Sequence, residues 1–510
     1  MDRNHGETQH SQFFETPIRH DAWERSPKSG SGTHRRAIVR KTMPQSAAAT
    51  FLRTPIGRRW LIAFLVLSLS PAQLGCDRQA LDRGIKPDVY LLLVDTLRAD
   101  HLSLYGYERP TSPHLDRFAR SAIVFENAVA TAPWTLPSVA SVMTGVYPSA
   151  HGLRATLSAE KATALRPDVT TLAEELASRG YRTVAIITNP WLMPKRFGLA
   201  RGFEEYIPLI MENAPVVHEL AREVITRDDP RPLFLYLHYM DPHGPYDRHT
   251  DTDPAGLGPL PANLERELTA DESASLPLYL RLSDTTDLGS YIRAYDRAIY
   301  AWDESFGSWI RWLDARKSVP APVVVVVADH GEEFTERGSW NHGSTLYEEQ
   351  LSVPWLLRLP GRPPMRVSDR VVSLIDVAPT LLAALGLPVA KTMMGSDVLS
   401  PKFAADRPVF AETEVRIGGI SDPHFVQRAV QRGKRKYIQR PSGPECYELA
   451  SDPLERSPDC VASAWRDRAR ADLERWAREN EKLASILGAS DPVELDSELR
   501  EQLRAIGYAQ

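Results

Sequence analysis

Four short, mainly apolar runs constrain the fold of this chain more than any other feature. A continuous run of this kind is typical of a parallel strand that is buried on both faces. The runs cover residues 89–94, 181–187, 232–237 and 322–327. Helical segments are predicted between them, at 137–143, 171–178 and 290–315. Strands that alternate with helices predict an α/β fold, in which a mainly parallel sheet is sandwiched by helices.

The length of the chain, 510 residues, allows one large domain and a smaller one. We place the main domain at 86–400 and a smaller α+β subdomain with charge-rich terminal helices at 401–510. Residues 247–287 are polar and rich in Pro, without a clear period, which predicts an insertion at the rim of a site.

The amino-terminal region differs in charge from the rest. Residues 1–59 carry a formal charge of +6, whereas the remainder carries −11. An acidic main part disfavours nucleic acid as a partner. Residues 1–57 contain few large apolar residues and are predicted to be disordered.

Residues 58–76 have the features of an export signal. Arg58 and Arg59 precede an apolar run of 11 residues, Trp60–Ser70. A membrane span needs about 20 such residues, so the run fits a signal peptide better. Gly75-Cys76 resembles a lipoprotein cleavage site, with Cys76 as the lipidated residue. We therefore expect an exported protein that is membrane-anchored, as a bacterial lipoprotein, or periplasmic. A cleaved signal peptide, an uncleaved anchor and a buried core segment are the alternatives.

Two further cysteines, Cys446 and Cys460, lie 14 residues apart in a loop-rich segment. An exported compartment permits a disulfide between them. Two free thiols are the alternative, because spacing alone does not determine geometry.

Polar residues follow two of the predicted strands. Asp95 ends the first strand, and Asp329-His330 ends the last. Ligands of open α/β sheets bind at the carboxyl ends of the strands. Taken singly, Asp95 is explained as a helix cap and Asp329-His330 as a turn. Together they indicate a metal site.

Four blocks of the chain, in this order, resemble sulfatases and their relatives in the alkaline phosphatase superfamily. The blocks are the Asp95 strand, Thr135-Leu-Pro-Ser-Val139, His238–Tyr246 and Ala328–Glu333. A weaker fifth block is Tyr447-Glu-Leu-Ala-Ser-Asp-Pro-Leu-Glu455. The resemblance extends from about residue 86 to the early 460s, and it implies an alkaline phosphatase/sulfatase-like fold with a catalytic domain at 86–400.

The second block departs from the family. Sulfatases carry Cys-x-Pro-x-Arg, or Ser in place of Cys, and oxidise the first residue to formylglycine. Here Thr135 holds that position and Val139 replaces the Arg. Because Thr cannot become formylglycine, the resemblance implies catalysis by an unmodified Thr135 hydroxyl. A formylglycine hydrate can eliminate sulfate, whereas a sulfated Thr has no such route. A phosphorylated Thr can be resolved by in-line attack of water, so phosphate becomes the favoured substrate.

The resemblance also implies one divalent metal ion. Its ligands would be Asp95, Asp329 and His330, with the Thr135 oxygen as a fourth. Thr96 and His330 replace an Asp and an Asn of the usual sulfatase set. A His ligand favours Mn²⁺ or Zn²⁺ over an all-oxygen Ca²⁺ site, with Mg²⁺ and Ca²⁺ as alternatives. The set is similar to that of the phosphoglycerol and phosphoethanolamine transferases.

Two histidines are predicted to contact the substrate. His243 matches a family histidine that contacts the substrate anion, and His342 lies where sulfatases place a substrate-binding Lys. Exposed loop histidines are the alternative. Asn189 lies near the position of an active-site Lys and His, whereas His238 is predicted to be a hydrogen-bonded core residue.

Three functions fit these residues. The first is a metal-dependent hydrolase that cleaves phosphate, phosphonate or sulfate esters of a small molecule, a glycan or a lipid. The second is a membrane-associated phospho-alcohol transferase acting on a glycan or lipid. Such transferases usually have several membrane spans, and this chain has one apolar run. The third is a catalytically silent binding protein, which would be expected to have lost Asp95, Asp329 or His330.

Overall fold

The computed structural model describes residues 76–77, 79, 83–155, 162–193, 197–249, 257–283, 285–414, 426–461 and 463–506. All of them belong to one compact unit, Leu67–Gln510. The predicted disordered segment 1–57 and nearly all of the predicted export signal 58–76 lie outside the described residues. In the part of the chain that is described, no helix is both long and apolar enough to cross a membrane.

The described residues form a central sheet of nine strands. Its order is β12-β2-β11-β8-β1-β7-β5-β6, and β13 pairs with β2. The strands are β12 (Met365–Val367), β2 (Ile123–Val129), β11 (Ser352–Arg358), β8 (Val323–Ala328), β1 (Val89–Val94), β7 (Leu233–Tyr239), β5 (Arg182–Ile187), β6 (Glu205–Pro208) and β13 (Val372–Ser373).

Only β11 runs against the other strands of this described sheet, because it is antiparallel to both β8 and β2. The remaining pairs are parallel. The four predicted strands are present as β1, β5, β7 and β8, and each is buried throughout. The prediction of a mainly parallel α/β sheet is therefore confirmed.

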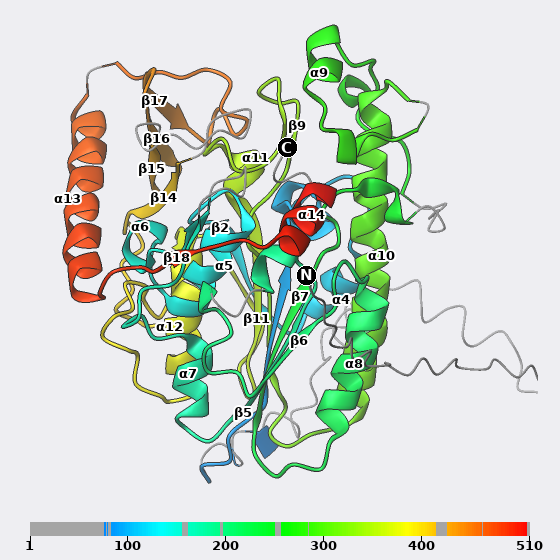
Figure 1. Cartoon of the computed structure of the whole chain (residues 1–510), viewed down its shortest axis with the longest axis vertical. Coiled ribbons are helices and arrows are strands. Elements are labelled where there is room, and N and C mark those ends of the chain that lie inside the picture. Colours follow the sequence, from blue (N-terminus) through cyan, green and yellow to red (C-terminus); the bar gives the residue numbers. More distant parts are fainter. Residues whose placement is uncertain are drawn as a thin grey trace, which may run out of the picture. The chain divides into compact units, whose positions relative to one another are not determined.

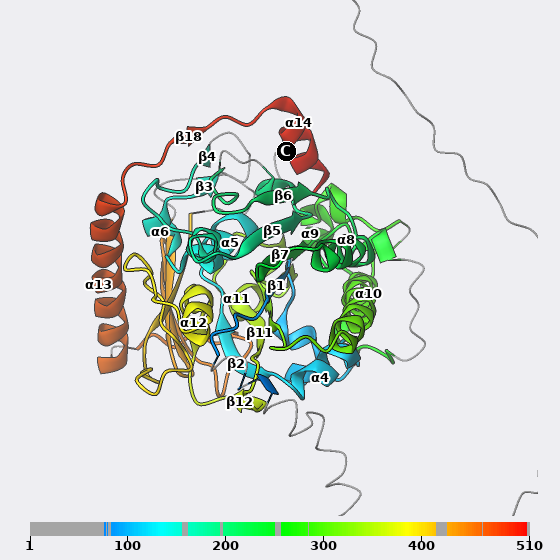
Figure 2. The ribbon, with the colours of Figure 1, turned by 90° about the horizontal axis from the view of Figure 1, so that it is seen from below.

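Helices cover both faces of the sheet (Figures 1 and 2). One face carries α4, α8 and α10, and the other carries α5 and α12. The helices are α4 (Pro113–Ala119), α5 (Thr135–Thr144), α6 (Pro148–His151), α7 (Leu172–Ala177), α8 (Ala214–Thr226), α9 (Ala270–Ser275), α10 (Leu288–Ala315), α11 (Glu348–Leu351), α12 (Val377–Ala384), α13 (Ala464–Ile486) and α14 (Ser497–Ala505). Asp287 begins α10 by accepting hydrogen bonds from the backbone of Gly289 and Ser290. Most of the aromatic side chains of α10 are buried in the core.

A second, antiparallel sheet follows the main domain. It has the order β14 (Val409–Thr413), β15 (Gln427–Arg432), β16 (Arg435–Arg440) and β17 (Gly443–Glu448). Trp476 of α13 packs against Phe410 and Tyr147, which joins this sheet to α13 and to the main domain. The predicted smaller α+β subdomain is thus present. The chain then leaves it, because β18 (Pro492–Val493) pairs with β4 (Ala162–Thr163), and β4 also pairs with β3 (Arg154–Ala155).

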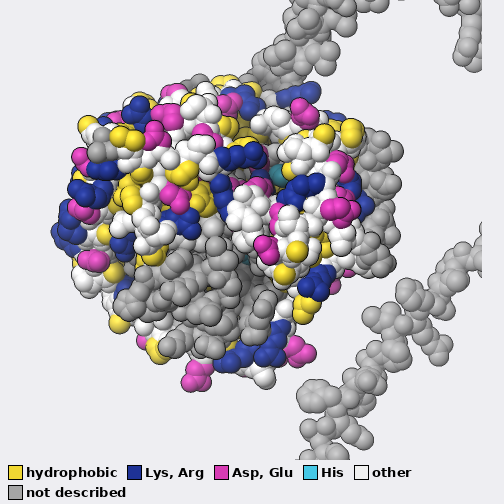
Figure 3. Space-filling view, turned by 90° about the horizontal axis from the view of Figure 1, so that it is seen from above, with side chains coloured by type: hydrophobic (Ala, Val, Ile, Leu, Met, Phe, Trp, Pro, Cys, Tyr) yellow, Lys and Arg dark blue, Asp and Glu magenta, His cyan; other side chains and the backbone are white. Residues whose placement is uncertain are grey.

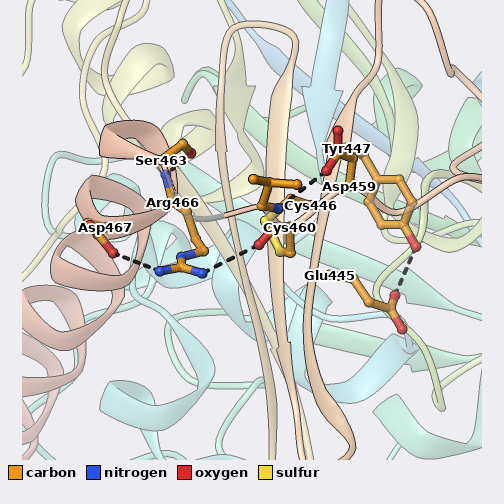
Figure 4. Close-up of a disulfide and its surroundings, with 9 residues drawn as sticks. Glu445, Cys446, Tyr447, Asp459, Cys460, Ser463, Arg466 and Asp467 are labelled. Carbon is orange, nitrogen blue, oxygen red and sulfur yellow. Dashed lines mark hydrogen bonds and ion pairs between the residues drawn. A yellow bond between two sulfur atoms is a disulfide. The ribbon is translucent and has the colours of Figure 1, made fainter.

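A disulfide joins Cys446 on β17 to Cys460, with an S–S distance of 1.99 Å and a Cα–Cα distance of 4.9 Å (Figure 4). The backbone N–H of Asp459 donates to the Cys446 carbonyl at 2.9 Å. The Arg466 guanidinium of α13 donates to the Cys460 carbonyl at 3.4 Å. Of the two alternatives that the sequence left open, the structure therefore has the disulfide.

Candidate active site

The order of the central strands brings the predicted site residues together. β1 lies between β8 and β7, and Val94 pairs with Ala328 on one side and Tyr239 on the other. Asp95 and Asp329 therefore follow neighbouring parallel strands at the same, carboxyl ends of these strands. Thr96 adopts a φ of 55°, which is uncommon for a β-branched residue. In this conformation its backbone N–H donates to the Asp329 carboxylate at 3.3 Å.

Asp95, Asp329 and His330 form a fully buried cluster. His330 Nε2 lies 3.5 Å from Asp95 Oδ1 and 3.6 Å from Asp329 Oδ2. Each of these three residues offers one ligand atom, and the three atoms lie within 4.8 Å of one another. Gly331 follows directly, and a Cβ there would lie 2.2 Å from the Glu349 carbonyl oxygen, so only glycine fits behind the cluster.

The donor atoms of this cluster fit a divalent metal ion. His330 Nδ1 donates to the Gly331 carbonyl at 2.8 Å, which leaves the Nε2 lone pair facing the two carboxylates. Asp95 Oδ1 and Asp329 Oδ2 are buried and have no hydrogen-bond partner among the described residues. Tetrahedral ligands about 2.1 Å from a metal lie about 3.4 Å apart, close to the separations found here. Buried charges are usually paired or coordinate a metal, so the set is complementary to a cation.

The electrostatics of the cluster lead to the same conclusion. Burial raises the pKa of Asp95 well above its usual range, and the neighbouring Asp329 raises it further. Burial likewise raises the pKa of Asp329. The pKa of His330 is well below its usual range because of burial and the nearby His342. A bound divalent cation would stabilise both carboxylates in their charged form.

Thr135 lies beside this cluster as the first residue of α5. Its Oγ1 is 3.5 Å from Asp95 Oδ2 and 3.4 Å from His330 Nε2. The side chain is fully buried. The amino terminus of a helix favours an anion bound against it. The Thr135 oxygen is therefore placed both to join the ligand set and to meet an anionic ester.

Asn189 contacts the cluster and Thr135, a role that the sequence only weakly indicated. It follows β5 and begins the 3₁₀ turn Pro190–Leu192, where its Oδ1 accepts from the Trp191 backbone at 2.9 Å. This bond leaves the amide Nδ2 to donate to Asp95 Oδ2 at 2.6 Å, and Nδ2 lies 3.5 Å from Thr135 Oγ1. Asn189 thus holds one Asp95 oxygen while the other faces His330.

His238 lies in β7 and is fully buried, as expected of a core residue. Its Nε2 is 3.7 Å from Asp95 Oδ2, and burial lowers its pKa to about 3. The neutral imidazole of His238 therefore lies next to Asp95 Oδ2.

Both predicted substrate-contacting histidines lie next to the cluster and are buried, so they are not exposed loop residues. The ring of His342 is 4.4 Å from that of His330 and 5.1 Å from that of His243. His243 Nδ1 donates to the Gly244 carbonyl at 2.6 Å, and its Nε2 has no hydrogen-bond partner among the described residues. Figure 3 shows this face of the molecule from above, with a hollow in which His side chains are visible and which Lys and Arg side chains flank.

A loop residue holds His342 and residues of two elements hold the neighbouring Gly343, and the sequence did not indicate these contacts. Glu332, which is fully buried, accepts from His342 Nδ1 at 3.0 Å and from the Tyr246 hydroxyl at 3.0 Å. The next residue, Gly343, donates its backbone N–H to Gln350 Oε1 at 3.0 Å. Its carbonyl accepts from the Thr413 hydroxyl at 2.7 Å. Gln350 belongs to α11 and Thr413 to β14, so the antiparallel sheet contributes to this wall of the site.

Comparison with known proteins shows which family the chain resembles. A family model described as Sulfatase matches residues 87–387. An endo-4-O-sulfatase of Bacteroides thetaiotaomicron is 23% identical, over 71% of this chain and 80% of that protein. An arylsulfatase of Clostridium perfringens is 23% identical, over 75% of this chain and 92% of that protein.

Solved structures show the same fold at low identity. A 2-O GAG sulfatase has a TM-score of 0.63 and 19% identity, covering 81% of this chain and 96% of that one. The phosphonate monoester hydrolase of Agrobacterium radiobacter has a TM-score of 0.61 and 20% identity, covering 81% of this chain and 100% of that one. The fold is thus shared by proteins named for sulfate esters and for phosphonate esters.

Proposed function

The chain belongs to the sulfatase family of the alkaline phosphatase superfamily, whose members are ester hydrolases, and from that premise we propose that it hydrolyses phosphate or phosphonate esters through the unmodified hydroxyl of Thr135. The observation that carries the proposal is the position of Thr135 Oγ1, 3.4 Å from His330 Nε2 in the buried cluster. At this position the chain has a residue that cannot become formylglycine, which supports catalysis by an unmodified hydroxyl. Retention of Asp95, Asp329 and His330 argues against a silent binding protein.

The ligands of one divalent metal, Mn²⁺ or Zn²⁺ on the chemistry of the donor set, would be Asp95, Asp329, His330 and Thr135. When bound, the metal supplies positive charge that favours loss of the Thr135 proton and stabilises charge on the substrate oxygens.

The chain's own residues then perform a two-step displacement. The Thr135 hydroxyl gives its proton to the solvent and its oxygen attacks phosphorus in line, the bond from phosphorus to the ester oxygen breaks, and a phosphothreonine forms. His342, oriented by Glu332, delivers a proton to the leaving alkoxide, which departs as the alcohol. His243, whose Nε2 carries a lone pair, lies beside the phosphoryl group and accepts a proton from water in the second step. Water next attacks the same phosphorus and gives a proton to His243 Nε2, the bond to the Thr135 oxygen breaks, and the Thr135 oxygen takes up a proton from the solvent. The products are the free alcohol and phosphate, or a phosphonate.

A matched panel of substrates tests this reaction. Aryl phosphate monoester, phosphodiester, phosphonate monoester and sulfate ester substrates share one leaving group, so only the transferred group differs. We expect kcat/KM for the best phosphorus ester to exceed that for the sulfate ester by about a hundredfold or more. Preference for the sulfate ester would show that the family's usual substrate persists despite Thr135. Relatives named as sulfatases make that outcome the main rival.

The contact from the antiparallel sheet gives a second test. Thr413→Val removes the hydroxyl that binds the Gly343 carbonyl but keeps the shape of the side chain. We expect kcat to fall about tenfold with little change in KM, because small displacements of an acid–base group are costly. Thr413→Ser should restore most of kcat.

Thr183→Val is the matched control for loss of a hydroxyl. The Thr183 hydroxyl also donates to a glycine carbonyl, that of Gly202, at 2.7 Å. Both Val variants should lower the melting temperature, but only Thr413→Val should lower kcat. Equal losses of kcat in the two Val variants would show that Thr413 contributes only to general stability.

A further inference from the structure

A groove lies at the end of the central sheet opposite the candidate active site. It has a volume of about 580 Å³ and is lined by α4, the last turns of α10, the start of β8 and the segment after β11. Pro322 precedes β8, whereas Asp329 follows it, so the groove and the metal-ligating cluster lie at opposite strand ends. Figure 2 views the molecule from this lower side. The floor of the groove includes Phe118, Ile310 and Leu313.

Cationic side chains converge on one histidine in this groove. Arg117 Nη1 lies 3.4 Å and Arg311 Nη1 3.3 Å from His114 Nδ1. His114 Nε2 lies 3.0 Å from a Glu304 carboxylate oxygen. Because Nε2–H donates to that carboxylate, Nδ1 is the acceptor for both guanidinium groups.

The positive charge of the groove is only partly compensated. Within the described ranges, Arg117, Arg311 and Lys317 form no ion pair with a carboxylate, whereas Arg358 is paired with Asp314 at 2.9 Å. The two guanidinium groups and the ammonium group that also lines the groove concentrate positive charge there. This charge favours binding of a phosphate group.

The position of His114 is built into the packing of α10. A Cβ at Gly307 would lie 2.2 Å from His114 Cγ, so this glycine makes room for the imidazole ring. Glycine in a helix interior is destabilising relative to alanine. The Asp303 carboxylate of α10 accepts from the backbone N–H groups of His114 and Leu115, both at 2.8 Å. The two helices are therefore locked together at the point where the cations meet.

The amino-terminal segment reaches the same groove. Asp77 lines it, and Asp77 Oδ1 accepts from the Ala321 backbone at 2.9 Å. Cys76, the residue expected to carry a lipid, comes directly before Asp77 and is exposed. An anchor attached to Cys76 would hold this end of the molecule against a membrane.

We propose that this groove binds the phosphate headgroup of an anionic phospholipid in the membrane to which Cys76 is anchored. Arg117, Arg311 and Lys317 bind the phosphate, and the apolar floor lies against the upper part of the lipid. The six-residue strand β1 then separates the bilayer surface from the active site by about 20 Å. The site faces away from the membrane, so its esters come from the aqueous phase or a glycan rather than from the lipid.

The full chain, purified from its membrane fraction and reconstituted in vesicles, tests this binding. Hydrogen exchange would be followed at residues 114–121 and 307–318 in vesicles of phosphatidylcholine alone or with phosphatidylglycerol. We expect slower exchange there only with phosphatidylglycerol, and loss of that protection at about 1 M salt, where charges are screened within about 3 Å. The double variant Arg117→Gln/Arg311→Gln should lose the protection.

The control variant is Arg435→Gln/Arg470→Gln, which removes the same charge from exposed residues of the antiparallel sheet and α13. It should keep the protection, and both double variants should keep wild-type hydrolysis of a soluble ester. Equal protection in neutral vesicles, or protection that survives Arg117→Gln/Arg311→Gln, would overturn the proposal. Equal protection by soluble glycerol phosphate without vesicles would also overturn it, in favour of a free anion.

Discussion

Thr135→Ala should lower kcat by several powers of ten, which is typical of the loss of a covalent nucleophile. The substitution removes the oxygen that lies 3.4 Å from His330 Nε2 and 3.5 Å from Asp95 Oδ2. The helix should still begin normally, since Pro137 remains in the first turn of α5. Turnover of the best phosphorus ester under metal saturation is the measurement.

Thr135→Ser is the matched control, because it keeps the hydroxyl and removes only a methyl group. It should retain much of the activity and form the same covalent phosphoryl intermediate, detectable by rapid quench and mass spectrometry. Thr135→Cys should gain little in a host with a formylglycine-generating enzyme, because Val139 breaks the recognition motif. If Thr135→Ala turns over as fast as the wild type, water attacks directly and the covalent mechanism is wrong.

The strands that position the site were predictable because their burial is uniform. β1 and β8 are unbroken apolar runs in the sequence, and both are fully buried in the structure. By contrast, β2 contains Glu126 and Asn127 and carries no clear strand pattern, although it pairs with β11, β12 and β13. The reversed direction of β11 was not predictable either, because burial patterns carry no information about strand direction.

The contacts around the nucleophile were harder to predict than the metal-ligating residues. Asp95 and Asp329-His330 end strong strands, and their role follows once those strands are neighbours. Asn189 ends β5, which is separated from β1 by β7, so its 2.6 Å bond to Asp95 depends on a turn that crosses a strand. Thr413 lies 70 residues from Gly343, on β14 of the antiparallel sheet, so no local pattern connects them.

Binding of one divalent transition metal per chain is the second prediction with a large effect. Elemental analysis of the native protein should find Mn or Zn at about one equivalent, since His330 disfavours Ca²⁺. Adding the metal to stripped wild-type protein should raise the melting temperature, because a ligand that binds only the folded state stabilises it. At a metal concentration of about 1,000 Kd, the gain is about 4 kcal/mol.

Asp95→Asn separates metal binding from general stability. It keeps the shape of the side chain but leaves one carboxylate, Asp329, beside His330. The metal-stripped variant should be at least as stable as metal-stripped wild type. Wild type without metal holds two carboxylates that are 0% exposed to solvent and lack a compensating charge, which destabilises the folded state. The variant should then show little thermal shift with metal and little activity.

Asp303→Asn is the comparison for loss of a buried carboxylate. Asp303 is also 0% exposed, but it caps the start of α4, away from the metal-ligating cluster. This variant should lose stability in both stripped and metal-loaded forms while keeping the full metal-induced shift. A metal-induced shift that survives Asp95→Asn unchanged, or a native protein that contains only Ca²⁺ or no metal, would refute the assignment of Asp95, Asp329 and His330. A shift lost in Asp95→Asn and kept in Asp303→Asn would leave the cluster at the ends of β1 and β8 as the binding site.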